Sequence, residues 1–256
     1  MIRQCKRLHS ASQTRFAAAT ARHSRSVESR AHSPGNSRDT KPLATHSKAV
    51  SGLAASKPAS KTGWHPLEQP LIWQGSEDEA VFQGMLPVQL SPPWKVILLS
   101  DGSVTRHLQL MTDLKVHVDC LEMANIGEDR EGLPMGAELI PGPLLQRQVL
   151  LRSPGPSQRA LVYAASWWNA DHVNEYLKDG SQPIWVSLSR ERTELYREIQ
   201  QVYHGNSPYL EEVFDTPGPF WGRQYLFWHN QQPLTLIYEV FSNSLEKYLG
   251  PCSAVI

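Results

Sequence analysis

The stretch from Phe220 to Phe241 constrains the fold of this chain more than any other. Two runs rich in aromatic and β-branched residues flank a polar segment, His229 to Gln232, and Pro233 follows it directly. Apolar runs of this kind, joined by a short polar turn, are typical of a β-hairpin. The sequence therefore predicts two antiparallel strands close to the end of the chain.

A single carboxylate stands inside the second of these runs. Because side chains alternate along a strand, Leu234, Leu236 and Tyr238 are expected to face the core, while Glu239 shares the opposite face with Ile237. Burying a carboxylate among such neighbours costs free energy unless the group is paired or protonated. Glu239 is therefore the first candidate for a chemical role.

The N-terminal segment, residues 1–61, differs in charge from the remainder. Its first sixty residues hold eleven Lys and Arg but only Glu28 and Asp39 as acids, which leaves fourteen basic and 23 acidic residues for the rest of the chain. The segment is rich in Ser, Ala, Thr and Arg, which predicts a disordered organellar transit peptide cleaved between about residues 40 and 63. Ser, Ala and Thr favour a plastid over a mitochondrion as its destination. A generic basic tail is the alternative.

Several classes of protein and site are not indicated. The acidic remainder would repel phosphate, so no nucleic-acid partner is expected. No run of eighteen apolar residues suggests membrane insertion. Cys5, Cys120 and Cys252 form no CxxC motif, and Cys120 is expected in the core. The histidines lack metal-ligand spacing, so no metal site is predicted, and the common nucleotide-binding and hydrolase motifs are missing.

Residues 62–256 are predicted to form one α+β domain with an antiparallel sheet. Apolar runs predict strands over 104–110 and 115–123, paired with each other, and over 144–151 and 159–168, paired as a hairpin, followed by the final hairpin. Helices are predicted over 78–83, 170–178 and, after Pro183, from Ile184 to Gly205. The Glu and Arg residues between 190 and 198 are expected on a solvated helix face. Residues 125–143 are expected to form a loop.

Charged residues on these apolar strands form the candidate site: Arg106, Arg147, Arg223 and Glu239. Arg147 shares strand parity with Val149 and Leu151, although it could also extend to water from a strand end. Arginine in an apolar site offers a rigid two-pronged donor to a carboxylate, and a desolvated Glu can exchange a proton. The set suits an anionic small molecule that undergoes proton transfer. For Arg223, a structural ion pair is an equally good interpretation.

Five motifs occur together in one order: Ser103-Val-Thr-Arg106, Arg147-Gln-Val-Leu-Leu151, Thr193-Glu-Leu-Tyr-Arg197, Phe220-Trp-Gly-Arg223 and Gln232-Pro-Leu-Thr-Leu-Ile-Tyr-Glu-Val-Phe241. In this order and spacing they resemble the chorismate lyase (chorismate–pyruvate lyase) family, in particular its plastid and cyanobacterial branch. The resemblance covers about residues 94–251. It implies an α+β fold with a mostly antiparallel, six-stranded sheet backed by helices, and a buried pocket beneath flaps.

The resemblance also implies an activity and a set of site residues. Family members convert chorismate to 4-hydroxybenzoate and pyruvate as monomers, without a metal or organic cofactor. By motif, Arg147 matches the arginine that binds the ring carboxylate, and Glu239 matches the glutamate near the ligand's hydroxyl. Val104 and Leu195 match positions whose main chain lines the ligand. The bacterial family has Met at the position of Val104, so packing over the ring differs here.

Two functional interpretations follow from the resemblance. The first is a plastid chorismate lyase with Glu239 and Arg147 as catalytic residues, whose product would supply a quinone head group. The second is a catalytically inactive protein that binds a small aromatic acid, since regulator domains of the same fold bind ligands without reacting them. Glu239 either assists proton transfer or only orients the ligand's hydroxyl. A pigment-associated role in the plastid has no motif to support it.

Overall fold

The computed structural model describes residues 63–81, 85–155, 158–177, 184–190 and 194–252. The predicted extension, residues 1–61, lies outside these ranges. The strands are β1 (Trp73–Gly75), β2 (His117–Gly127), β3 (Leu144–Arg152), β4 (Ala160–Asn169), β5 (Tyr196–Gly205), β6 (Phe220–His229) and β7 (Gln232–Phe241). The helices are α1 (Glu77–Val81), α2 (Pro92–Leu99), α3 (Val104–Thr112), α4 (Val173–Tyr176), α5 (Ile184–Arg190), α6 (Pro208–Phe214) and α7 (Glu246–Leu249), with 3-10 turns η1 (Ala137–Leu139) and η2 (Asn243–Leu245).

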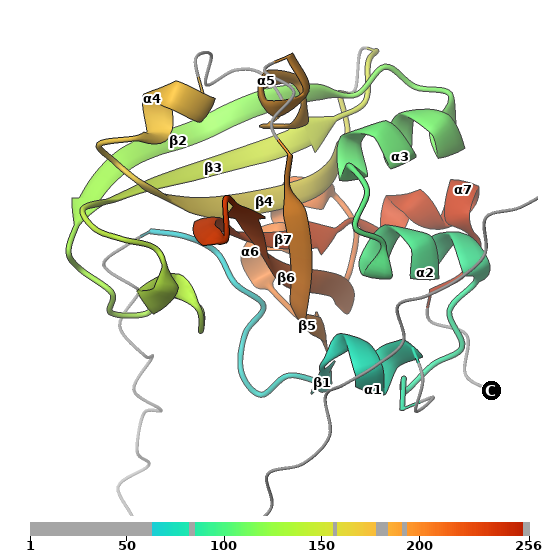
Figure 1. The fold of residues 1–256 in the computed structure, drawn as a ribbon. Helices are drawn as coiled ribbons and strands as arrows, with labels where there is room; N and C mark the ends of the chain where they lie inside the picture. The colour runs from blue at the N-terminus through green and yellow to red at the C-terminus, as the bar shows by residue number, and fades with distance from the viewer. Residues whose placement is uncertain (1–62, 82–84, 156–157, 178–183, 191–193, 253–256) are drawn as a thin grey trace, which may run out of the picture. The chain divides into compact units, whose positions relative to one another are not determined.

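The strands form one antiparallel sheet in the order β1-β5-β6-β7-β4-β3-β2 (Figure 1). The predicted α+β class and antiparallel sheet are confirmed, and the short edge strand β1 brings the described strands to seven instead of six. The hairpin of β6 and β7 is central, as expected for its aromatic and β-branched sequence. Asn230 and Gln231 form its turn, both with positive φ.

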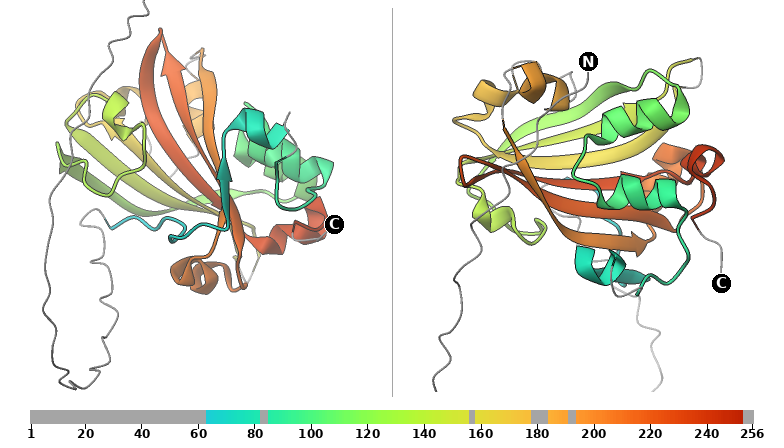
Figure 2. Two further views of the ribbon diagram at one scale, coloured as in Figure 1. Left: turned by 90° about the horizontal axis from the view of Figure 1, so that it is seen from below. Right: turned by 45° about the vertical axis from the view of Figure 1, so that its right-hand side comes forward.

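Each face of the sheet has its own apolar core. Helices α2, α3 and α7 lie against one face, where Trp94, Ile97 and Leu108 pack on Tyr225, Ile237 and Phe241 (Figures 1 and 2). Helix α6, η1 and the extended segment that begins at Trp64 cover the other face, where Leu236 and Tyr238 lie. The alternation in β7 divides as predicted for Leu236, Tyr238 and Glu239, and it places Glu239 on the face of α2 and α3. Leu234 departs from the prediction, because it packs against the core on the face of α2 and α3.

The predicted strand over 104–110 is wrong, because this segment forms α3. Ser103 caps the helix by accepting a hydrogen bond from the Arg106 backbone N–H at 3.3 Å. Val104, Leu108 and Thr112 are buried at intervals of four residues, which is the spacing of one helical face. Arg106 therefore lies exposed on a helix, not on an apolar strand. The predicted strand over 115–123 is real but pairs with β3.

The predicted helix from Ile184 to Gly205 is also wrong over most of its length. Among the described residues of this stretch only α5 is helical, and Tyr196 to Gly205 form β5, which pairs with β6. The expected solvated face is absent from the described part of this segment, because Arg197 is buried and Glu198 accepts a 2.7 Å hydrogen bond from Trp228 Nε1. Cys120, expected in the core, is exposed on the edge strand β2.

Candidate active site

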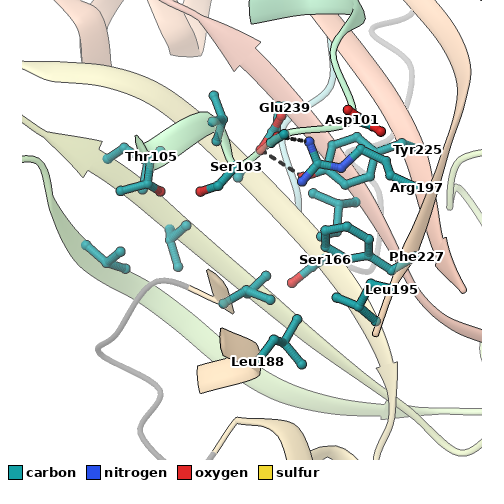
Figure 3. Close-up of a pocket in the computed structure, with 18 of the residues that line it drawn as sticks. Asp101, Ser103, Thr105, Ser166, Leu188, Leu195, Arg197, Tyr225, Phe227 and Glu239 are labelled. Atoms are coloured by element: carbon teal, nitrogen blue, oxygen red, sulfur yellow. Dashed lines mark hydrogen bonds between the residues drawn. The ribbon is translucent and has the colours of Figure 1, made fainter. Parts of the chain in front are cut away.

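A cavity of about 350 Å³ lies on the face of the sheet that α3 covers. This volume is at the lower end of the range for small-molecule sites, about 300 to 1,000 Å³. Its walls are strands of the sheet, the turn before α3, helix α5 and the start of β5 (Figure 3). The walls are mainly apolar: Val104, Val118, Val149, Leu151, Ala164, Ile184, Leu188, Leu195, Phe227 and Ile237.

The cavity brings together four residues that the sequence singled out, although they come from distant parts of the chain. Val104 lies in the first turn of α3, Arg147 in β3, Leu195 just before β5 and Glu239 in β7, and all four line the cavity. Of the other two candidates, Arg106 and Arg223 do not contribute to this lining.

Arg147 reaches the cavity because of its place in the strand. Its side chain shares a face with Val149 and Leu151, and only 2% of the residue is exposed. Arg147 is opposite Ser166 in β4, and Ala164 in the same strand is opposite Glu239 in β7. Strands lie about 4.8 Å apart, so the backbones of β3 and β7 are separated by about 10 Å.

Glu239 is held by two donors from the neighbouring strand β6. Arg223 Nε donates to its Oε2 at 2.7 Å, and the Tyr225 hydroxyl donates to its Oε1 at 3.0 Å. Burial, followed by the charge of Glu239, raises the pKa of Tyr225, so its hydroxyl remains a donor. A carboxylate has about four acceptor positions, so two remain for a ligand.

Arg223 lies behind Glu239 and is fully buried. Its Nη1 donates to the carbonyl oxygens of Leu98 and Ser100 at 3.3 and 3.1 Å, which connects the sheet to the end of α2. Arg223 thus forms a structural ion pair that also positions Glu239. Gly222 permits the close approach of these strands, because a Cβ there would lie 2.8 Å from the Glu239 carbonyl oxygen.

Arg197 is a cavity residue that sequence reasoning assigned to a solvated helix. Its guanidinium lies over the rings of Tyr225 and Phe227, with the Cζ atom 4.4 and 4.7 Å from their centroids. Burial lowers the pKa of Arg197, although a guanidinium keeps its charge in proteins. The one available signal was its place in the third family motif. Figure 3 shows Arg197, Tyr225 and Glu239 on one side of the cavity.

The turn before α3 closes this end of the cavity. Asp101, Gly102 and Ser103 line it, and Arg197 Nη1 donates to the Gly102 carbonyl oxygen.

Among the described residues, no three His, Cys, Asp or Glu side chains gather in the manner of metal ligands. Within those same ranges, no helix is long and apolar enough to cross a membrane.

Comparison with known proteins finds matches in sequence and in structure. A protein described as uncharacterized protein ycf21 from Cyanophora paradoxa is 35% identical over 176 residues, which cover 69% of this chain and 90% of that protein. Its counterpart from Porphyra purpurea is 33% identical over 60% of this chain and 83% of its own length. The effector domain of PhnF from Mycobacterium smegmatis is 12% identical, with a TM-score of 0.42 over 57% of this chain and 92% of that domain.

Residues 98–249 match the family described as chorismate pyruvate-lyase Rv2949c-like. The matched region contains all four predicted residues that line the cavity. The chain therefore belongs to this family.

Proposed function

We propose that this protein cleaves chorismate to 4-hydroxybenzoate and pyruvate. The observation that supports this most directly is that Arg147 and Glu239 face one cavity from strands two apart in the sheet. Chorismate carries its ring carboxylate and its hydroxyl at opposite ends of one ring, which is the arrangement such a pair would hold. Membership of a family named for this activity adds support.

The reaction is an elimination followed by aromatisation. The bond between the ring carbon and the ether oxygen breaks and its electron pair leaves with enolpyruvate, while the ring loses a proton. Enolpyruvate then gains a proton to become pyruvate. In this scheme Arg147 binds the ring carboxylate through a charged, two-pronged contact, and the apolar walls exclude water. Because aromatisation drives the reaction, positioning and charge stabilisation are the main tasks of the protein.

Glu239 has the second role in this proposal. It accepts a hydrogen bond from the ligand's hydroxyl and assists the proton transfer. Among the described residues of the lining, Glu239 is the buried carboxylate, since Asp101 is exposed. Tyr225 and Arg223 hold its two oxygens, so its orientation is set before the ligand arrives. Val104 and Leu195 line the ligand with their main chain in this scheme.

The second candidate is a protein that binds a small aromatic acid without reacting it. The hydrogen bonds of Glu239 favour this second candidate, because both of its carboxylate oxygens already accept hydrogen bonds from the protein. Such a carboxylate could serve only to orient a hydroxyl.

We further propose that the protein works in a plastid as a monomer, and that its product supplies a quinone head group. The composition of residues 1–61 supports the plastid, and the relatives from Cyanophora paradoxa and Porphyra purpurea are consistent with it. Nothing in the comparisons favours the mitochondrion. Organelle import of a fluorescent fusion, with and without residues 1–61, tests the location.

One pair of measurements separates the two candidate functions. Ligand binding to the native state raises the melting temperature, so chorismate and 4-hydroxybenzoate should both stabilise the protein. A lyase also converts chorismate, and 4-hydroxybenzoate then appears on chromatography. Stabilisation without product supports the binding protein. The absence of both stabilisation and product would exclude this ligand class.

A further inference from the structure

Arg197 has donor capacity that the protein does not use. The residue is 8% exposed and lines the cavity, and its Nη1 donates to the Gly102 carbonyl oxygen. Its Nε is buried without a hydrogen-bond partner, and its Nη2 has no partner among the described residues. Arg197 also forms no ion pair with a described carboxylate, and Asp101 on the adjacent turn is exposed.

These two nitrogens have a specific geometry. Nε and Nη2 point from the same edge of the planar guanidinium, which is the edge that takes both oxygens of one carboxylate. The rings of Tyr225 and Phe227 hold that plane in place, and Phe227 is directly opposite Arg197 in the pairing of β5 with β6. The guanidinium is therefore fixed in orientation before any ligand binds.

The first turn of α3 adds positive potential beside it. Ser103, Val104 and Thr105 line the cavity, and the first N–H groups of a helix have no partner within the helix. The helix dipole places partial positive charge at the same end. The Arg197 bond to Gly102 joins the guanidinium to the turn that precedes this helix.

We propose that the guanidinium of Arg197, with the N-terminus of α3, binds a second carboxylate. The preferred ligand is thus a ring compound with two carboxylates. In strand order Glu239 on β7 lies between Arg147 on β3 and Arg197 on β5. A ligand with its ring carboxylate at Arg147 and its hydroxyl at Glu239 would direct a side-chain carboxylate, such as that of an enolpyruvyl group, towards Arg197.

This inference rests on the proposed function for its ligand class, and two unreactive compounds test it. They are 4-hydroxybenzoate and 3-(carboxymethoxy)-4-hydroxybenzoate, which share a ring and differ by one carboxylate arm. Calorimetric titration of the full chain should show tighter binding of the dicarboxylate. Arg197→Gln should weaken the dicarboxylate at least about tenfold and change 4-hydroxybenzoate less than about twofold, since only the former uses the charged contact.

Two variants control for folding and charge. Arg197→Lys keeps the charge without the two-pronged edge, so it should recover part of the lost affinity. Arg152→Gln alters an arginine of β3 that pairs with Asp119 outside the cavity, and it should bind both compounds as the wild type does. The melting temperature of each variant without ligand reports on its fold.

Equal weakening of both compounds by Arg197→Gln, unchanged dicarboxylate binding, or failure of the wild type to bind either compound would overturn the second subsite. Because neither compound can be cleaved, the result does not depend on turnover. A selective loss in a protein that leaves chorismate intact retains the subsite and removes the lyase. An equal loss of affinity for both compounds, in a protein that cleaves chorismate, retains the lyase and removes the subsite.

Discussion

Arg223 Nε donates a 2.7 Å hydrogen bond to Glu239 Oε2 across the central strand pair, where the two side chains are 0% and 4% exposed. These residues are directly opposite each other in the β6–β7 register. Little water reaches either group, so each charge depends on the other. The ion pair with Arg223 thus orients the Glu239 side chain that lines the cavity.

Removing the cation of this pair should destabilise the fold strongly. Arg223→Met leaves the Glu239 charge buried without its cation, and we expect a loss of about 3 to 5 kcal/mol in the free energy of unfolding, measured by urea denaturation. The double variant Arg223→Met/Glu239→Gln removes both charges and should be more stable than Arg223→Met alone. If the loss in unfolding free energy of the double variant equals the sum of the losses of the two single variants, the pairing is contradicted.

Glu239→Gln tests proton transfer while preserving the side-chain volume. We expect kcat for chorismate to fall by about a hundredfold or more, as is typical when an acid–base group is lost. Glu212→Gln, an exposed change on α6, serves as the matched control and should leave kcat unchanged. A loss of less than about tenfold would limit Glu239 to orienting the hydroxyl.

Arg147→Gln should raise KM and also lower kcat, because the proposed contact both binds and orients the ring carboxylate. Steady-state kinetics on chorismate measure both constants, and Arg152→Gln on the same strand serves as the control. An unchanged KM would remove Arg147 from the carboxylate site.

His204, which does not line the cavity, should make the free energy of unfolding depend on pH. Burial lowers its pKa to about 4, and its ring stacks on Trp221 with a centroid distance of 4.3 Å. The unfolded state binds the proton more readily, so this contribution is complete above about pH 6.5 and is lost as the pH falls towards 4. Between pH 7 and pH 5 we expect about 2 kcal/mol of lost unfolding free energy from this group.

His204→Phe retains a ring for the stack and removes the titration. Urea denaturation at the two pH values should therefore show a smaller pH dependence for the variant than for the wild type. The same dependence in both proteins would assign the effect to other groups.

The hairpin and the β3–β4 pair could be predicted because their alternation is local and strong. Arg147 followed from the same parity, since Val149 and Leu151 fix the face of β3. Helix α3 was missed because Val104 and Thr105 are β-branched, although the Ser103 cap and the spacing of its buried residues decide the outcome.

Strand β5 was missed for a different reason. Its charged residues suggest a solvated helix. In the fold, however, the Arg197 guanidinium lies over the rings of Tyr225 and Phe227, and Glu198 accepts a hydrogen bond from Trp228 Nε1. All of these partners lie on β6, about thirty residues further along the chain, where no local pattern could indicate them. Arg197 therefore became a candidate only once the sheet was known.

Incubation of the full chain with chorismate tests the proposed function most directly. Chromatography follows 4-hydroxybenzoate, and an enzyme-coupled assay follows pyruvate in the same samples. We expect equal amounts of the two products, at a rate that Glu239→Gln and Arg147→Gln each reduce and that Arg152→Gln does not. Chorismate that remains intact while it raises the melting temperature of the wild type would contradict the lyase and leave a binding protein.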